Sequence, residues 1–262
     1  MDNILYKTIM KFSTNSPTKL SQPVNLQPQR KPLVVFCVPG GQFSPAFFDS
    51  WTKMMLAAAR GLPFDIMVSR HYSPVIFHCR ANILGADNRA GKHQIPFQGK
   101  VKYDYLMWLD TDIQFEPEQV ISLFKTMEKH KNIEVCGGIY LTTSGTHSTI
   151  VKDWDLDFFL KTGMFPFLSP QQLREIASQS PMKLAEVFYA GMGFLMMKKG
   201  ALEKITYPWF EPIMHEIEFS KDFSSEDVSM CWKLNEAGVK IYIDPSIIVG
   251  HEKSTIIRER MM

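Results

Sequence analysis

The sequence predicts an α/β fold in which a mixed, mostly parallel sheet carries helices on both faces. The first observation is that short apolar, β-branched runs alternate with longer stretches whose apolar residues recur at helical spacing. The second is an entirely apolar run, residues 106–109, which leads directly into the acidic pair Asp110 and Asp112. Ligands of open α/β sheets bind where strands end, so this pair marks the expected binding edge.

The first half of the chain alternates strands and helices. A run of buried-strand length at residues 32–38 ends in a Pro-Gly-Gly turn, where backbone can approach a ligand. Ser44 is a suitable N-cap for the next helix, and Gly61 follows its end. The predicted elements are a helix at 45–60, a strand at 64–69, a helix at 76–90 and the central strand at 106–109. This order is typical of a parallel sheet.

The second half is less regular. Pro117 opens a helix, and a strand with a glycine pair follows at 135–141. Residues 142–170 show no clear period, which indicates a binding loop or lid, or an insertion that packs its own aromatic residues. With the short helix after it, this insertion covers about residues 142–180. The remaining predicted elements are that helix at 171–179, a strand at 185–197 interrupted by two glycines, a helical turn at 200–205, a helix from Ser224 or Ser225 to Gly238, and a strand at 239–244 ended by Pro245.

Composition limits the possible functions. The chain has 262 residues, 45% of them hydrophobic, and a net charge of +2, which is too small to argue for nucleic acid as a partner. The four cysteines are scattered singly and are expected to be reduced core thiols. We expect residues 1–30 to be an extended or disordered segment and residues 31–262 to form the domain. No signal core or membrane span is recognisable, so a cytoplasmic protein is expected.

Three polar clusters are candidates for chemistry. Two carboxylates spaced two apart, Asp110 and Asp112, suit Mg²⁺ or Mn²⁺ shared with a ligand's phosphates, although short acidic pairs are also common turn residues. Glu226 and Asp227 fall in the first turn of a helix, where the helix dipole favours acids without any catalytic role. His251 follows an apolar stretch and has an alternative explanation as a core histidine.

The order of these motifs resembles that of the GT-A glycosyltransferases, chiefly the family 2-like inverting enzymes. The matching features are a strand with Asp-x-Asp, a strand with Gly-x-Gly-Phe, and Glu-Asp opening a helix that ends in Ala-Gly, followed by a strand and a histidine. The resemblance covers residues 32–253. It implies the Rossmann-like GT-A fold and metal-dependent transfer of a sugar from a UDP- or GDP-sugar to a hydroxyl of a glycan, protein or small molecule, with Mn²⁺ or Mg²⁺ as cofactor.

The resemblance also implies roles for individual residues. Asp227 would be the general base that takes a proton from the acceptor hydroxyl, a chemically suitable role for a positioned carboxylate. Metal ligands would be Asp110, Asp112 and His251. The donor would contact Val38, Pro39, Ser69, Arg80, Asn82, Asp110, Gly191, Gly193 and Glu226.

The chain also departs from the family pattern. Ser69 and Arg70 stand where many members have an acid that holds the base, which leaves the nucleotide open. No Gln-x-x-Arg-Trp-type element is present near the carboxyl end, which favours transfer of single sugars over polymerisation. Two other classes stay open, namely another metal-dependent enzyme, such as a nucleotidyltransferase or phosphatase, and a non-catalytic sugar-nucleotide or glycan-binding domain.

Overall fold

The computed structural model describes residues 30–217 and 220–254. The described residues from Lys31 to Ser254 belong to one compact unit. The prediction for residues 1–30 lies outside the described residues except for Arg30, so the extended segment stays a prediction.

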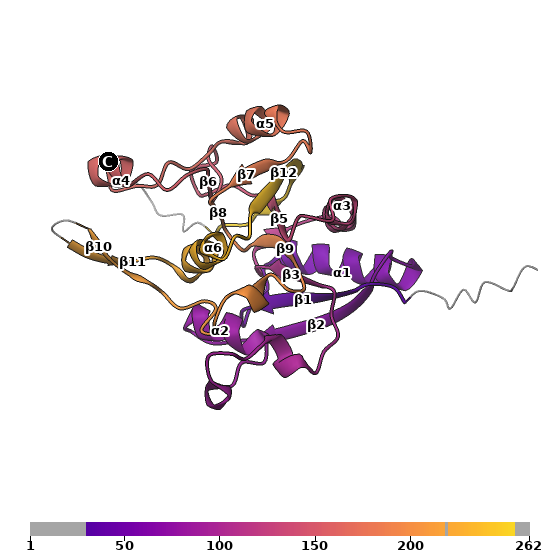
Figure 1. The fold of residues 1–262 in the computed structure, drawn as a ribbon. Coiled ribbons are helices and arrows are strands. Elements are labelled where there is room, and N and C mark those ends of the chain that lie inside the picture. Colours follow the sequence, from indigo (N-terminus) through magenta and orange to yellow (C-terminus); the bar gives the residue numbers. More distant parts are fainter. Residues whose placement is uncertain (1–29, 218–219, 255–262) are drawn as a thin grey trace, which may run out of the picture. The chain divides into compact units, whose positions relative to one another are not determined.

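The centre of this unit is a sheet of seven strands (Figure 1). Its order is β2-β1-β3-β9-β5-β12-β7, and the pairings make five strands run one way while β7 and β9 run the other. This confirms the predicted mixed, mostly parallel sheet. The strands are β1 (Leu33–Pro39), β2 (Asp65–His71), β3 (Tyr105–Leu109), β5 (Val135–Ile139), β7 (Ala185–Val187), β9 (Phe194–Lys198) and β12 (Ile241–Ile248).

Helices cover both faces of the sheet. Successive residues of a strand point to opposite faces, so each face carries its own set of apolar side chains that must be buried. In β3, Tyr105, Met107 and Leu109 pack on one side, whereas Leu106 and Trp108 pack on the other. The first side is covered by α1 (Pro45–Arg60) and α3 (Pro117–Lys129). The second side is covered by α2 (Ile76–Ile83), α5 (Pro170–Gln179) and α6 (Glu226–Glu236).

Local signals correctly predicted several helix boundaries. The Ser44 hydroxyl accepts a hydrogen bond from the backbone N–H of Phe47 at 3.1 Å, and α1 spans the residues predicted for it. The helix predicted over 76–90 is wrong beyond Ile83. The backbone turns at Gly85, whose φ of +67° is left-handed, and only a short 3₁₀ turn (Asn88–Ala90) follows.

Two strand predictions also need correction. The strand expected over 185–197 is divided into β7, β8 (Tyr189–Ala190) and β9, and β9 inserts antiparallel between β3 and β5. Pro245 does not end β12, because the strand continues to Ile248 through a shift in register against β5 that avoids the need for a proline N–H.

The stretch from 142 to 170 contains some regular structure. β6 (Ile150–Val151) pairs with β8, and α4 (Leu156–Thr162) is capped by Asp155, whose carboxylate accepts a hydrogen bond from the N–H of Phe158 at 2.8 Å. The hairpin of β10 (Met214–Ile217) and β11 (Ser220–Phe223) had no signal in the sequence analysis.

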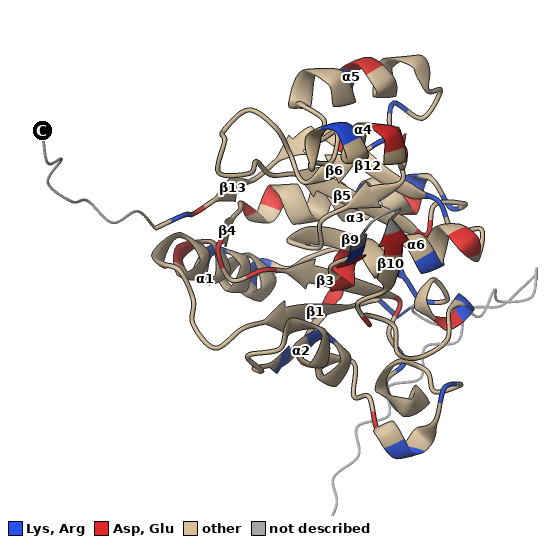
Figure 2. Cartoon of the chain, turned by 90° about the vertical axis from the view of Figure 1, so that its left-hand side faces the viewer, with Lys and Arg blue, Asp and Glu red and all other residues tan. Residues whose placement is uncertain are grey.

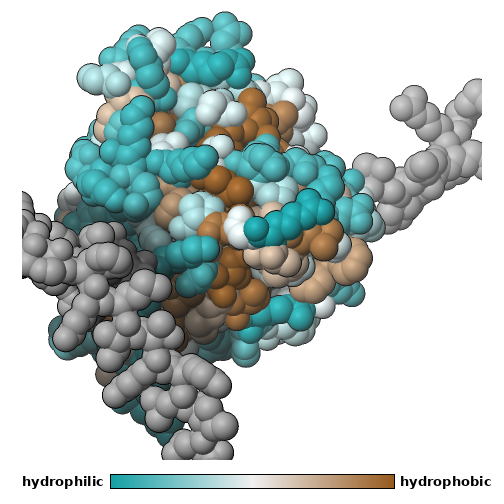
Figure 3. Space-filling model, turned by 90° about the vertical axis from the view of Figure 1, so that its right-hand side faces the viewer, coloured by the Kyte–Doolittle hydropathy of each residue, from teal (hydrophilic) through white to brown (hydrophobic). Residues whose placement is uncertain are grey.

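The described part of the chain has a buried apolar core. All four cysteines are buried and unpaired, as predicted. The side of this unit shown in Figure 3 is mainly hydrophilic, with apolar residues gathered in a narrow band. No helix in the described ranges has the length and apolar character needed to cross a membrane.

Candidate functional site

The predicted acidic pair lies at the end of β3, beside the chain's last described strand. The N–H of Asp110 donates to the carbonyl of Gly193 at 3.1 Å, which joins this turn to the turn before β9. β4 (Ile113–Gln114) then pairs with β13 (Gly250–His251), with His251 opposite Ile113. In Figure 2, acidic segments gather where β3 ends and where α6 begins. Residues far apart in the sequence therefore meet at this edge.

Arg80 connects two of the predicted motifs. Its side chain is buried, with Nη2 lying 3.2 Å from Asp110 Oδ1 and Nε lying 3.1 Å from Glu226 Oε1. The guanidinium carbon also lies 5.5 Å from the ring centroid of Trp108. Arg80 thus contacts two of the acids predicted to bind donor, and its own contact with a donor stays a prediction.

Glu226, one of the acids around Arg80, lies where its negative charge is disfavoured. Burial and the neighbouring charge of Asp227 raise the pKa of Glu226, and the positive charge of Arg80 opposes this rise. The Nη1 atom of Arg80 is buried without a hydrogen-bond partner in the described structure. One cation therefore stabilises a group of carboxylates that would otherwise repel one another.

Asp112 has two cationic neighbours. Its Oδ2 atom lies 3.2 Å from His251 Nε2 and 2.7 Å from Lys253 Nζ. Burial acts to raise the pKa of Asp112, but hydrogen bonds from His251 and Lys253 outweigh it and lower the pKa to about 2. The same contact with Asp112 raises the pKa of His251, against a smaller opposing effect of burial.

Asp112 and His251 fit two ligands of a divalent cation. His251 Nδ1 lies 2.7 Å from the carbonyl of Leu141, so this nitrogen carries a proton, and when Nε2 loses its own proton, its lone pair becomes available to a cation beside Asp112. The third predicted ligand, Asp110, contacts Arg80 through its Oδ1 atom. Among residues 30–217 and 220–254, no three His, Cys, Asp or Glu side chains form a metal-binding group, so the predicted three-ligand set stays a prediction.

Replacing Asp112 tests how strongly its ion pairs with His251 and Lys253 stabilise the fold. We expect Asp112→Asn to lower the free energy of unfolding at pH 7 by about 1 kcal/mol, since the side chain is partly exposed and its ion pairs are screened. The low folded-state pKa means that ionised Asp112 stabilises the fold above its ordinary pKa of 3.8, and that this stabilisation disappears as the pH falls through about 2. Urea unfolding at pH 7 and pH 3 measures the loss, with Asp65→Asn as control. An equal loss at both pH values would contradict the assignment.

Asp227 is held by three donors at the start of α6. Tyr189 Oη donates to Oδ2 at 2.8 Å, while Ser225 Oγ and the N–H of Val228 donate to Oδ1 at 2.5 and 2.9 Å. Burial and the charge of Asp227 raise the pKa of Tyr189 well above its ordinary value, so the phenol remains a donor. A carboxylate has about four lone-pair sites, so Asp227 keeps capacity for one more proton donor.

Gly191 and Gly193 allow the central turns to pack closely. A Cβ atom at Gly191 would lie 2.2 Å from Tyr140 Oη and 2.6 Å from Thr149 Oγ1, and one at Gly193 would lie 2.8 Å from Tyr140 Cζ. The N–H of Gly193 also donates to Tyr140 Oη at 3.0 Å. Internal packing accounts for both glycines, and their predicted role beneath a donor sugar stays a prediction.

The remaining predicted donor residues lie at the ends of β1 and β2 and on α2. Val38 and Pro39 are buried in the last part of β1. Ser69 Oγ donates to the carbonyl of Ile83 at 2.6 Å, which ties β2 to the end of α2. Asn82 is exposed, and its Nδ2 lies 3.3 Å from His71 Nε2. Ser69 is thus engaged internally, whereas Asn82 is accessible to a ligand.

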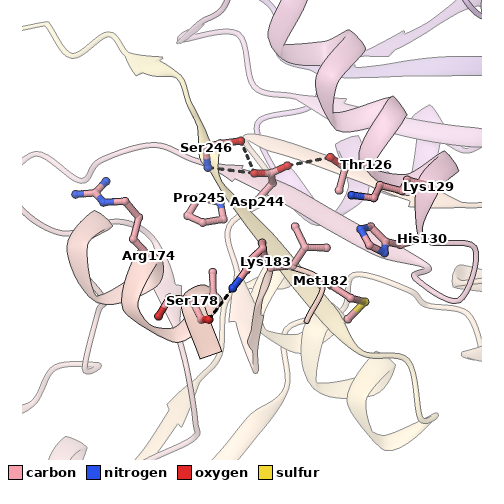
Figure 4. Close-up of a pocket in the computed structure, with 12 residues that line it drawn as sticks. Thr126, Lys129, His130, Arg174, Ser178, Met182, Lys183, Asp244, Pro245 and Ser246 are labelled. Atoms are coloured by element: carbon pink, nitrogen blue, oxygen red, sulfur yellow. Dashed lines mark hydrogen bonds between the residues drawn. The ribbon is translucent and has the colours of Figure 1, made fainter. Parts of the chain in front are cut away.

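A separate cavity of about 470 Å³ lies where β12 bends between α3 and α5 (Figure 4). Its buried acid, Asp244, accepts hydrogen bonds from Thr126 Oγ1 at 2.9 Å and Ser246 Oγ at 2.6 Å. None of the residues predicted to bind donor or metal lines it. We therefore place the candidate site at the edge of the sheet where β3 ends, which carries Asp110, Asp112 and His251.

Two polar residues of this site, Lys253 and Tyr189, are not among the residues predicted from the sequence. Lys253 could have been noticed because residues two apart in extended chain point to the same side, as do Lys253 and His251. Tyr189 had no such signal, because its contact with Asp227 depends on how β8 and α6 meet in space.

The fold defines the class of protein, which is an α/β protein of the GT-A, Rossmann-like type. No protein-family model and no curated protein matches the sequence. Solved structures do match. GalNAc-T7 with UDP, GalNAc and Mn²⁺ has a TM-score of 0.51 and 11% identity, over 84% of this chain and 43% of that chain. The A197 protein from STIV has a TM-score of 0.47 and 15% identity, over 87% of this chain and 98% of that chain.

The likeness to GalNAc-T7 shows a shared fold. The chain spans less than half of that glycosyltransferase, and an identity of 11% does not transfer its donor, metal or acceptor. Function must therefore be argued from the side chains at the edge of the sheet.

Proposed function

We propose that the chain transfers a sugar from a nucleotide-sugar donor to an acceptor hydroxyl, with inversion at the anomeric carbon. The observation that carries the proposal is the link through Arg80, which binds Asp110 at the end of β3 and Glu226 at the start of α6. Through this link, the acids suited to donor binding lie at the same edge as Asp227, which is suited to proton removal. The GT-A fold of a known glycosyltransferase supports this use of the edge.

The donor's diphosphate would lie near Asp112, His251 and Lys253. Lys253 offers a flexible ammonium that can pair with phosphate oxygens, and its present partner is Asp112. A divalent cation held by Asp112 and His251 would neutralise charge that develops on the leaving diphosphate. Asp110 would then face the nucleoside part of the donor, held in place by Arg80.

Asp227 would act on the acceptor. The acceptor oxygen forms a bond to the anomeric carbon while the bond from that carbon to the nucleoside diphosphate breaks, and the diphosphate leaves with the electron pair. Asp227 takes the proton of the acceptor hydroxyl, because an un-ionised hydroxyl is a weak nucleophile. The donors from Tyr189, Ser225 and Val228 keep the Asp227 carboxylate in one orientation for this step.

A panel of UDP- and GDP-sugars tests the proposal. We expect one donor to raise the unfolding temperature of the wild-type chain in the presence of Mn²⁺ or Mg²⁺, because a ligand that binds only the folded state stabilises it. The same donor should give little or no shift with Asp112→Asn and a normal shift with Asp65→Asn. The anomeric configuration of the product, read by NMR, tests inversion.

The same panel separates the alternatives. Donor binding without transfer to any acceptor would favour a non-catalytic sugar-nucleotide-binding domain. Cleavage of nucleotides irrespective of the sugar would favour another metal-dependent enzyme. Absence of binding to every donor, with and without metal, would contradict the proposed function.

A further inference from the structure

A small aromatic pocket opens beside α6, next to the candidate base. Its walls come from the segment around α4, from the β10–β11 hairpin and from the start of α6, and Figure 1 draws these three elements on the same side of the unit. The residues that line it are Trp154, Phe159, Phe165, His215, Asp222, Phe223, Ser224, Ser225 and Val228.

The pocket is in direct contact with the residues that hold Asp227. Ser225 and Val228 both line it, and both donate hydrogen bonds to Asp227 Oδ1. Asp227 itself does not line the pocket, but these two contacts place its carboxylate next to the pocket. This is where an acceptor hydroxyl must lie if Asp227 removes its proton.

The rings of the pocket are held in place by one another. The Trp154 ring centroid lies 5.4 Å from that of Phe165, 5.9 Å from that of His215 and 5.1 Å from that of Trp232. Phe159 lies 5.4 Å from Phe165 and extends the same cluster. Such fixed aromatic faces suit a flat ligand, since little side-chain entropy is lost on binding.

The polar groups of the pocket restrict the ligand further. Asp222 and Ser225 are exposed, so the pocket offers a carboxylate and a hydroxyl oxygen that can accept hydrogen bonds, while the Ser225 hydroxyl proton is donated to Asp227. Among the described residues, no Lys or Arg side chain lines the pocket, and His215 Nε2 lies 3.1 Å from Ser224 Oγ. An anionic ligand would be repelled by the carboxylate of Asp222. A neutral ring with apolar C–H faces and hydroxyls around its edge fits this combination.

We propose that the aromatic pocket is the acceptor subsite and that it takes a pyranose ring of an uncharged carbohydrate. The assignment rests on the proposed function for the identity of the reaction. The C–H face of the sugar packs on the aromatic rings, and its hydroxyls donate to Asp222 and Asp227. The acceptor class is then a glycan or glycoside, in preference to an anionic or a peptide acceptor.

Phe223 can be replaced without removing a side chain from the folded core, so it provides a test of the pocket. Its side chain is 63% exposed although it lines the pocket. Removing it should weaken sugar binding by about tenfold, as expected for one lost aromatic contact in a small site. Phe48 on α1 is 61% exposed and lies outside the pocket, so Phe48→Ala is a matched control.

The experiment uses the full chain and a panel of methyl glycosides of glucose, galactose, mannose and N-acetylglucosamine. Saturation-transfer NMR and tryptophan fluorescence report their binding. We expect at least one glycoside to bind the wild type, with about tenfold weaker binding for Phe223→Ala and for Asp222→Asn and no change for Phe48→Ala. A wild type that binds no glycoside, or binding that both pocket variants leave unchanged, would overturn the proposal.

Thermal-shift measurements of donor binding on the same samples test the proposed sugar transfer separately from the proposed acceptor subsite. A donor that binds while every glycoside fails overturns only the acceptor subsite. Glycosides that bind through Phe223 while every donor fails support a carbohydrate site and overturn the transfer reaction. Failure of both overturns both.

Discussion

An Asp227→Asn variant is expected to lose at least 100-fold in transfer rate, as is typical when a general base is removed. The amide cannot take the acceptor's proton, whereas its size leaves the packing at the start of α6 nearly unchanged. Donor affinity should stay within about twofold, because Asp227 contacts Tyr189, Ser225 and Val228, none of which we assign to donor binding. Transfer kinetics and donor binding on the same preparations measure the two effects.

Asp49→Asn, on the exposed face of α1, is the control for this variant and should transfer at the wild-type rate. Full activity of Asp227→Asn would remove the general base from the mechanism. Equal loss of donor binding and rate would instead assign Asp227 a structural role.

Arg80→Met is expected to lower the free energy of unfolding at pH 7 by about 3 kcal/mol, because it leaves buried carboxylates without their cation. Glu226 bears most of this cost, since its side chain is nearly buried and burial already raises its pKa. Urea unfolding measures the loss. The exposed Arg174 on α5 has no ion-pair partner in the described ranges, and Arg174→Met should change stability by less than about 0.5 kcal/mol.

The pH dependence of the Arg80→Met loss follows from Glu226. A raised folded-state pKa means that ionised Glu226 costs stability above its ordinary pKa of 4.5, and removing Arg80 increases this cost. The loss should therefore shrink as the pH falls and Glu226 becomes protonated. Combining Arg80→Met with Glu226→Gln should recover part of the loss at pH 7. No recovery in the double variant would show that the ion pair is not the cause.

The sequence was sufficient to predict those parts of the fold that depend on residues close together in the chain. Ser44, Pro45 and Gly61 marked the ends of α1, because caps and helix breakers act within one turn. The apolar run of β3 predicted a fully buried strand, since a sheet covered on both faces leaves no exposed position. The position of Asp110 and Asp112 at the end of that strand followed from the same pattern.

No local sequence pattern predicts the contacts between segments that lie far apart in the sequence. β9 pairs antiparallel with β3 and β5, and nothing within residues 194–198 determines which strands will lie beside it. Pro245 predicts the end of a strand because proline lacks an N–H, but a shift in register lets β12 continue past it.

The sequence by itself determined the class of fold, the acidic end of β3 and the acids that open α6. Only the tertiary structure decided which charges meet, because ion pairs depend on distance in space. It paired Arg80 with Asp110 and Glu226, Lys253 with Asp112, and Tyr189 with Asp227. The partners in these pairs are 30, 146, 141 and 38 residues apart. Local patterns cannot encode contacts over such separations, whereas the packing of α2, α6 and the β13 strand around one sheet edge produces all of them.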